Sequence, residues 1–200
     1  MATIDTLEPI HADVVLKAIR DRRSMGKVLE TVPPRAVIEQ ILEAGTWAPN
    51  HHLSEPWRFF VLTGDGRLGL GAALADAVVE GQEPGEERQR KWDHQSLRPL
   101  RAPGVIAIAV EPGPEDQCIE IEEIASGAAA GQNMLLAAHA LGLAAIWRSG
   151  RPTYSRQVRE FLKLSERGVV LGFIYLGYPS MEPPKRERRP IHDVTTWLDH

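Results

Sequence analysis

Cysteine is nearly absent from this chain, since Cys118 is the only one among its 200 residues. An internal disulfide is therefore excluded, and no zinc site with cysteine ligands is indicated, which favours an intracellular protein. An excess of positive charge is also missing, because 23 Lys and Arg stand against 27 Asp and Glu, a net charge of -4. Nucleic-acid binding generally needs a basic face, so this balance argues against a general nucleic-acid binder.

Long apolar runs are missing as well. The most apolar window, residues 125–143, is interrupted by Ser126, Gln132, Asn133 and His139, and it predicts a buried helix and no membrane span. Residues 1–10 contain Asp5 and Glu8 and lack a basic start followed by an apolar run, so no signal peptide is predicted. We therefore expect a cytoplasmic protein that does not enter a membrane.

What the chain does contain suits one domain over residues 1–200. At this length and 43% hydrophobic residues, folding buries roughly 70% of the unfolded surface. Hydrophobic spacing and helix-end signals predict helices at 13–22, 31–45 with Gly45 as C-cap, 67–79, 120–141 and 155–164. Alternating aromatic and β-branched residues predict strands at 58–63, 105–110, 143–147 and 169–178. We find no internal repeat and no linker between domains.

The segment 81–100 differs in kind, because it is densely charged and nearly free of aliphatic residues. Such a composition buries little, so the segment is either a mobile loop or a solvated helix. We hypothesise that it covers the space where a substrate binds. Its one large apolar side chain, Trp92, has the alternative role of fixing the segment to the surface.

Residues 64–69 match the pattern G-x-G-x-x-G, which follows a predicted strand and opens a predicted helix. A dinucleotide-binding unit also needs a second parallel strand soon after that helix, ending in an acid for the ribose. The charged segment 81–100 intervenes instead. We therefore interpret the match as a glycine-rich turn.

Three clusters have side chains suited to a bound anion or ring. Arg22-Arg23-Ser24 ends the first helix, residues 48–57 form a loop with two histidines, and Trp147-Arg148-Ser149-Gly150 ends a strand. Two arginines beside a hydroxyl offer planar donors that match a phosphate. Alternatively, the arginines only stabilise the end of a helix through its dipole.

The small residues 125–131 would let the long helix pack closely against another backbone. This packing is equally consistent with a dimer core and with the core of the monomer.

These clusters, in this order, resemble the FMN-dependent nitroreductase-like family, and within it the short bacterial NAD(P)H nitroreductases. The resemblance extends from about residue 14 to residue 197. It implies an α+β sandwich, with a central, mainly antiparallel sheet flanked by helices, in a homodimer that binds FMN at the subunit interface. It also implies that NAD(P)H and an electron-poor nitroaromatic or quinone acceptor use the flavin in turn, by a ping-pong mechanism without a catalytic protein side chain.

The resemblance assigns residues to the flavin. Arg22, Arg23 and Ser24 match the phosphate ligands, and Trp147, Arg148 and Ser149 match the contacts to the N5 edge of the ring. The positions of Trp47 and His51 match contacts from the second subunit, and Trp47 is alternatively a core residue. Arg186, with Arg188, matches a C-terminal basic motif at the phosphate, or is part of a solvated charge run. Lys27 matches a basic residue near the pyrimidine edge.

The chain departs from the family at the ring loop, where Leu53 and Glu55 stand in place of an Asn and a Gln. The histidine pair in this loop lacks a nearby carboxylate or cysteine at metal-ligand spacing, so we expect no metal. Two alternatives therefore stay open. One is a flavin store or sensor without turnover, and the other is a relative that acts in reductive dehalogenation or flavin breakdown.

Overall fold

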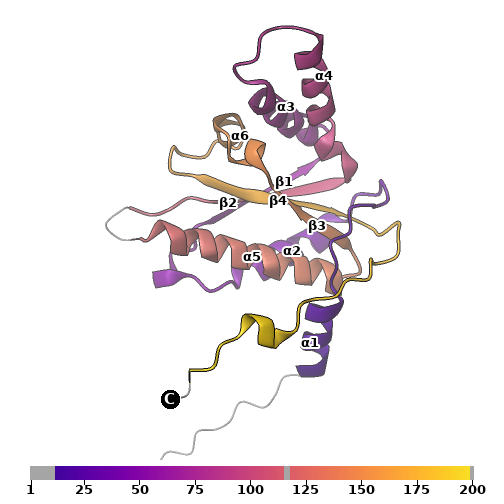
Figure 1. Ribbon diagram of the computed structural model, residues 1–200, viewed down its shortest axis with the longest axis vertical. Coiled ribbons are helices and arrows are strands. Elements are labelled where there is room, and N and C mark those ends of the chain that lie inside the picture. Colours follow the sequence, from indigo (N-terminus) through magenta and orange to yellow (C-terminus); the bar gives the residue numbers. More distant parts are fainter. Residues whose placement is uncertain (1–11, 115–117, 199–200) are drawn as a thin grey trace, which may run out of the picture.

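A four-stranded sheet lies between two layers of helices in the computed structural model, which describes residues 12–114 and 118–198. The strands follow the order β1-β2-β4-β3, and every neighbouring pair is antiparallel. Figure 1 shows α3, α4 and α6 over one face and α2 and α5 over the other. The strands are β1 (Trp57–Thr63), β2 (Gly104–Val110), β3 (Ala144–Arg148) and β4 (Val169–Gly177). The expected α+β fold with an antiparallel sheet is confirmed.

The helices are α1 (Ala12–Asp21), α2 (Arg35–Thr46), α3 (Gly66–Val79), α4 (Glu86–Ser96), α5 (Glu120–Ala140) and α6 (Arg156–Phe161). Short 3-10 helices are η1 (His51–Leu53), η2 (Arg98–Arg101), η3 (Arg151–Tyr154) and η4 (Ile191–Val194). Within the described ranges, no helix has the length and apolar character needed to span a membrane.

The central strands owe their continuous apolar sequences to burial on both faces. In β2, Val105, Ala107 and Ala109 belong to the core under α3 and α6. Ile106 and Ile108 belong to the core under α2 and α5. Successive side chains of a strand point to opposite faces, so a strand between two helical layers is apolar at every position.

Helix α2 begins four residues later than predicted and does not end at Gly45. Pro34 is its N-cap, with φ -55° and ψ 146°. Pro33 and Pro34 disfavour helical backbone in the residues before them, Val32 and Pro33, so the helix does not begin at residue 31. The helix continues to Thr46, and a Cβ on Gly45 would lie 2.9 Å from Cγ of Met134. Glycine at this position therefore allows α2 to approach α5, and the prediction that it is a C-cap was wrong.

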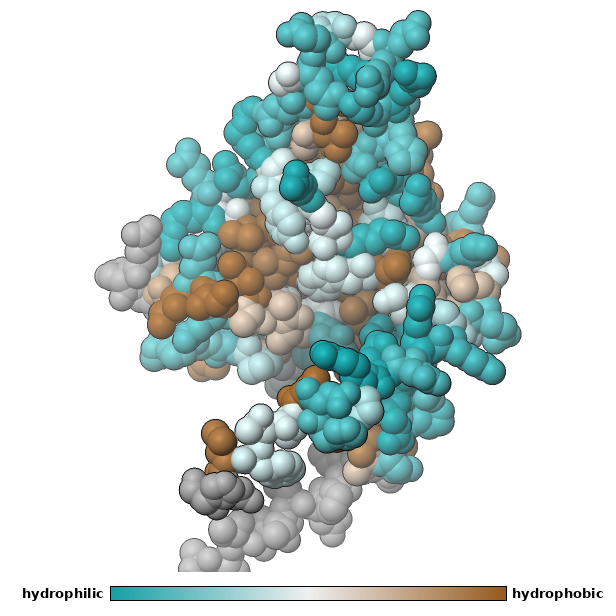
Figure 2. All heavy atoms as spheres, in the orientation of Figure 1, coloured by the Kyte–Doolittle hydropathy of each residue, from teal (hydrophilic) through white to brown (hydrophobic). Residues whose placement is uncertain are grey.

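The charged segment 81–100 contains the solvated helix α4, which decides between the two sequence-based alternatives. Trp92 Nε1 donates a hydrogen bond to Asp76 Oδ1 at 2.8 Å and so ties α4 to α3. A Cβ on Gly71 would overlap the backbone carbonyl of Ser96, so the two helices are in close contact. Figure 2 shows hydrophilic residues over this end of the molecule. Trp92 therefore anchors the segment, as the alternative interpretation held.

The small residues of α5 bring this helix close to its own sheet. A Cβ on Gly127 would lie 2.6 Å from Val110 Cγ1, and a Cβ on Gly131 would overlap the Trp147 indole. Ala128, on another side of the helix, is exposed. The glycines therefore serve packing within the monomer.

The glycine-rich sequence 64–69 is a turn between β1 and α3, as interpreted from the sequence. Strand β1 is an edge strand whose neighbour, β2, is antiparallel, so the parallel pair of a dinucleotide-binding unit does not form here. Gly64 has φ 50°, and a Cβ on Gly69 would lie 2.6 Å from Phe161 Cε2. The glycines allow the turn and the packing of α6 on α3.

Candidate functional site

The Arg22-Arg23-Ser24 motif leads from α1 onto the free edge of β3. Ser24 forms a parallel bridge with Ala145, and Met25 N donates to Ala145 O at 3.0 Å. Trp147-Arg148-Ser149-Gly150 follows at the other end of the same short strand. The fold thus brings together the first and third clusters, which are far apart in the sequence.

Gly26 is the point of contact between these two clusters. A Cβ on Gly26 would lie 3.0 Å from Arg148 Nη2, so the absence of a side chain leaves room for that guanidinium. Lys27 is exposed, and its backbone oxygen accepts a hydrogen bond from Ser180 N at 3.3 Å. Arg148, and not Lys27, is therefore the cation that lies against the Ser24–Gly26 segment.

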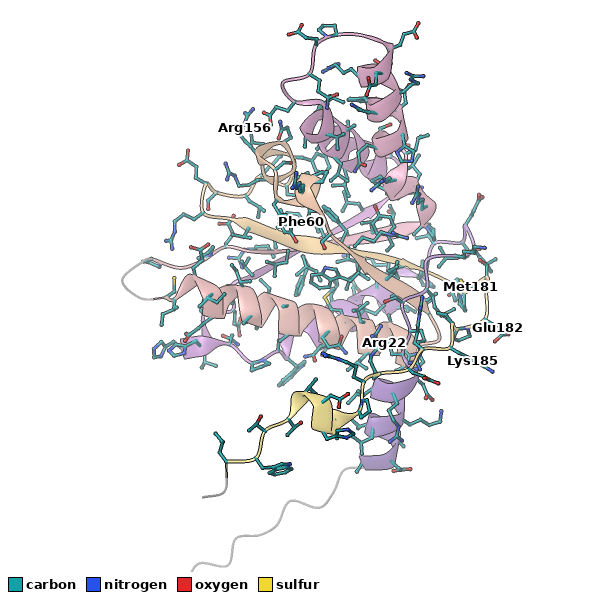
Figure 3. All side chains as sticks on the ribbon, in the orientation of Figure 1. Arg22, Phe60, Arg156, Met181, Glu182 and Lys185 are labelled. Atoms are coloured by element: carbon teal, nitrogen blue, oxygen red, sulfur yellow. The ribbon has the colours of Figure 1, made fainter. Side chains whose placement is uncertain are left out.

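Arg22 is half-buried, and it forms no ion pair with residues 12–114 or 118–198. Its Nε is buried and has no hydrogen-bond partner in the described chain. Burial lowers the pKa of Arg22 from its usual value, and the positive charges of Arg188 and Arg23 lower it further. Figure 3 shows Arg22 at the end of α1 on the same side of the molecule as Lys185 in the C-terminal segment. Positive charges gathered at one position attract an anion.

The other two arginines proposed for the phosphate differ from Arg22. Arg23 turns back onto α1, because its Nη1 donates to the carbonyl oxygens of Arg20 and Arg22. This is the helix-end role that the sequence left open for Arg23. Two C-terminal arginines, Arg186 and Arg188, are both exposed. The charge of Arg188 lowers the pKa of Arg22.

Trp147 and Arg148 point to opposite faces of the sheet. The Trp147 indole packs between Gly131 of α5 and Gly172 of β4, where a Cβ on either glycine would overlap it. The Arg148 guanidinium lies 5.4 Å from the centre of the Tyr175 ring, and its buried Nε has no hydrogen-bond partner within residues 12–114 and 118–198. Trp147 therefore holds the strand in place, while Arg148 presents its charge to a cavity.

That cavity has a volume of about 300 Å³ and opens beside the Trp147–Gly150 turn. Its lining includes Gln95, Arg98 and Arg101 together with Arg148 and Tyr175. Burial raises the pKa of Tyr175, and the three arginines oppose this increase, so all three charges lie near one phenol.

Arg98 and Arg101 were missed by the sequence analysis, which treated the segment 81–100, with Arg98 inside it and Arg101 directly after it, as a cover. They begin and end η2, and in a 3-10 helix residues three apart lie on the same side. Their spacing of three was the available signal. It becomes informative only once the backbone conformation around Pro99 is known.

The ring loop lies at the opposite end of α5 from Arg22. His51 Nδ1 lies 3.1 Å from Glu122 Oε2, in the first turn of α5. Met25 lines a cavity together with His139, in the last turn. At 1.5 Å per helical residue, these two ends of α5 are roughly 25 Å apart. His51 therefore lies at the far end of α5 from the segment that follows Arg22.

The loop itself is strained and exposed. His52, Leu53 and Glu55 have φ values of 51°, 56° and 43°, a left-handed region that favours glycine. Leu53, one of the two departures from the family, is 81% exposed. Trp47, before the loop, is 79% exposed, which rules out the alternative that it is a core residue. Exposed aromatic and aliphatic groups of this size indicate a contact surface.

One buried carboxylate holds this loop in its conformation. Glu123 is 2% exposed, and its Oε1 accepts a hydrogen bond from Ser54 Oγ at 2.8 Å. Asn50 Oδ1 accepts a hydrogen bond from Glu55 N at 3.0 Å, so this amide oxygen is engaged within the loop. No group of three or more His, Cys, Asp or Glu residues that could hold a metal ion occurs among residues 12–114 and 118–198.

These features define an α+β sandwich protein with unpaired cations along one edge of its sheet. The family model described as "Nitroreductase family" matches residues 19–178. The chain therefore belongs to the nitroreductase family.

Two kinds of relative agree with this assignment. The chain is 33% identical over 168 residues to the "Putative NAD(P)H nitroreductase YdjA" of Escherichia coli, covering 84% of this chain and 89% of that protein. A nitroreductase-like family protein from Bacillus cereus has a similar structure, with a TM-score of 0.80, 27% identity and coverage of 93% and 96% of the two chains. A protein from Desulfovibrio desulfuricans, described as "a putative nitroreductase in complex with fmn", has a TM-score of 0.66 and 27% identity, with coverage of 93% and 97%.

Proposed function

We propose that this protein is an FMN-dependent oxidoreductase that passes electrons from NAD(P)H to an electron-poor acceptor such as a nitroaromatic or a quinone. The observation that carries the proposal is the half-buried, unpaired Arg22 beside Arg188, at the edge of β3. The names of related proteins, which include NAD(P)H nitroreductases and an FMN complex, support it. We infer a cytoplasmic location from the single cysteine.

The phosphate of FMN suits the cations at the end of α1. Arg22 and Arg188 offer guanidinium donors, and the exposed Ser24 adds a hydroxyl. We keep Arg23 and Arg186 in the phosphate site through their charge, with Arg22 as the main ligand. A phosphate would give the buried Nε of Arg22 a partner and would remove the repulsion between the arginines.

The ring of FMN fits at the other end of strand β3, beside the Trp147–Gly150 turn. From Arg22 to Gly26 the chain spans at most roughly 13 Å, so a phosphate at Arg22 and a ring near Gly26 can belong to one molecule of FMN. Arg148 brings a positive charge beside Gly26, where it can stabilise negative charge on the pyrimidine edge. Ser149 and the backbone of the Trp147–Gly150 turn would contact the N5 edge of the ring. When bound, FMN supplies the hydride-accepting and electron-donating chemistry, and these side chains orient it.

We further propose that the site is completed by a second copy of the chain, so that the protein is a homodimer. His51 and the exposed Trp47 would contact the ring in the partner, because the length of α5 separates His51 from Arg22 of its own chain. The apolar residues Val14 and Ile19 of α1 are half exposed, as expected for a surface that a partner covers.

The purified protein is expected to be yellow and to contain one FMN per subunit of a dimer. Mass spectrometry of the released cofactor identifies the flavin, absorbance gives its stoichiometry, and light scattering gives the mass of the assembly. The phosphate cluster of Arg22 and Arg188 accounts for a single terminal phosphate, so FMN is expected and not FAD. Release of FAD, or failure of the protein to take up FMN, would contradict the proposal.

Turnover is expected to be ping-pong. The one glycine-rich turn that resembles a dinucleotide site is not built as one, so the nicotinamide has to use the same cavity as the acceptor. Initial rates at several concentrations of NAD(P)H and a quinone should give parallel double-reciprocal lines. A non-reducing nucleotide analogue should compete with the acceptor for the reduced enzyme. Intersecting lines would indicate two separate sites.

A flavin store or sensor without turnover is the second candidate, and the departures at Leu53 and Glu55 favour it. Both side chains are exposed, and neither replaces the amide contacts that the family makes to the ring. Stopped-flow mixing of the flavin-loaded protein with NADH or NADPH separates the two functions. Rapid bleaching of the flavin supports the oxidoreductase, and unchanged absorbance supports the store.

A further inference from the structure

The cavity beside the Trp147–Gly150 turn contains more positive charge than the proposed flavin site uses. Arg98, Arg101 and Arg148 all line it, and none of its lining residues is Asp or Glu. None of the three arginines has an ion-pair partner within the described parts of the chain. Cavities lined by charges of one sign concentrate ligands of the opposite sign.

The arginines approach one another because three separate elements meet here. Arg98 and Arg101 come from η2, directly after α4, while Arg148 ends β3. Their common neighbour is Tyr175 of β4, which Arg148 overlies at 5.4 Å. Convergence of like charges on one phenol is unfavourable in the free protein, and a bound anion would relieve it.

The remaining walls are suited to a polar group. Gln95, 7% exposed, and Thr153, 3% exposed, line the cavity together with the backbone of Ser149 and Gly150. The volume of about 300 Å³ is enough for a phosphate or for an aromatic carboxylate. Arg98 and Arg101 are exposed, so they are reachable from solvent.

We propose that this cavity binds an anionic group, a phosphate or a carboxylate, of a substrate of the flavin reaction, with Arg98 and Arg101 as its donors. The proposal rests on the proposed function, which assigns the Trp147–Gly150 turn to the flavin ring. An anion held by η2 would anchor the substrate next to this turn. The planar guanidinium group of arginine can donate two parallel hydrogen bonds to a phosphate or to a carboxylate.

The anion is not the phosphate of FMN. FMN has one phosphate, and the cluster of Arg22 and Arg188 at the end of α1 provides for it. The second cluster lies on the other side of Gly26, where Arg148 contacts the Ser24–Gly26 segment. The phosphates of NAD(P)H and a carboxylate on the acceptor are the two sources of the second anion.

The test uses the flavin-loaded protein and the variants Arg98→Gln and Arg101→Gln, alone and together. Arg90→Gln is the matched control, because Arg90 is an exposed residue of α4 that does not line the cavity. Isothermal titration calorimetry measures binding of tetrahydro-NADPH and tetrahydro-NADH, which cannot be oxidised. A second series compares para-nitrobenzoate with para-nitrobenzyl alcohol, which has the same ring without the charge.

Either substitution at η2 is expected to weaken binding of the anion about tenfold, as for loss of one charge-assisted hydrogen bond. If the anion belongs to the donor, both dinucleotide analogues lose affinity in the variants. If it belongs to the acceptor, nitrobenzoate loses affinity and nitrobenzyl alcohol does not. Arg90→Gln should change neither, and added salt should weaken the interaction.

Two outcomes would overturn the proposal. One is unchanged affinity for both dinucleotides and for nitrobenzoate in the double variant. The other is loss of FMN from the variants, which would make the cavity part of the flavin site. Calorimetry needs no turnover, so it reports on the cavity even if NAD(P)H fails to bleach the flavin. Such a failure would contradict the oxidoreductase alone.

Discussion

Arg22→Ala is expected to weaken FMN binding roughly 10- to 100-fold, as for loss of a charge-assisted contact to a phosphate worth about 1.5 to 3 kcal/mol. Arg22 is half-buried, and its Nε has no hydrogen-bond partner in the part of the chain that the structure describes. A phosphate bound there would be shielded from water by the end of α1 and the C-terminal segment. Fluorescence titration of the flavin-free protein with FMN measures the change.

Arg58→Ala is the matched control for this experiment. Arg58 is an exposed arginine of the edge strand β1, and its Nη1 donates to the backbone oxygen of Trp57 at 2.8 Å. It carries the same charge as Arg22 without a role at the flavin, so its removal should leave FMN affinity unchanged. Equal losses in Arg22→Ala and Arg58→Ala would remove Arg22 from the phosphate site.

Arg188→Ala should weaken FMN binding less than Arg22→Ala does. Arg188 is exposed, so its charge is screened by solvent, although it is close enough to lower the pKa of Arg22. Arg22→Lys separates charge from geometry, since lysine keeps the charge but lacks the planar set of donors. Intermediate affinity for this variant would show that both contribute.

Gly131→Ala is expected to destabilise the folded protein by about 1 to 3 kcal/mol, the usual range for overpacking a core. The new methyl group would overlap the Trp147 indole, and the indole cannot retreat because Gly172 lies against its other side. In a chain of this size such a loss lowers the melting temperature by several degrees, roughly 2 to 4 °C per kcal/mol. Differential scanning calorimetry measures it.

Two further variants make the Gly131 experiment specific. Gly66→Ala adds the same methyl group to a helix, but its nearest neighbour there is Leu62 Cβ at 3.9 Å, so the melting temperature should stay the same or rise. Trp147→Leu in the Gly131→Ala background should recover part of the stability, because the smaller side chain removes the overlap. A melting temperature of Gly131→Ala equal to that of the unmodified protein would show that the Trp147 strand can move.

Gly131 also links stability to the site. Trp147 holds β3 from the face opposite to Arg148, so a displaced indole moves the turn that we assign to the flavin ring. FMN affinity should therefore fall together with the melting temperature in Gly131→Ala. This coupling explains why glycine stands at this position in a helix, where alanine is otherwise favoured.

The elements with strong local signals were predictable from the sequence. The four strands were predicted within one residue at each end, because alternating or continuous apolar residues between turn residues are a local property. The start of α2 was predicted four residues too early. Two adjacent prolines exclude helical backbone before them, and this local rule was not applied.

The candidate site was predictable only where a motif is contiguous. Arg22-Arg23-Ser24 and Trp147–Gly150 were identified as short motifs and as a resemblance to a family. From the sequence, Arg22 and Ser24 were the expected phosphate ligands, with Arg23 beside them. The structure separates the two arginines: Arg23 donates to the carbonyl oxygens of Arg20 and Arg22, whereas Arg22 Nε has no hydrogen-bond partner among residues 12–114 and 118–198.

By itself, the sequence determined the α+β class, the positions of the strands and helices, and a family with a known cofactor. It could do so because apolar spacing and short motifs are local properties of the chain. Only the tertiary structure decided that Arg98 and Arg101 share a cavity with Arg148, and that Arg188 is the C-terminal arginine that acts on Arg22. The physical reason is that these neighbours depend on the order of the strands and on close approaches at glycines such as Gly26. Those contacts join residues far apart in the chain and leave no periodic pattern in it.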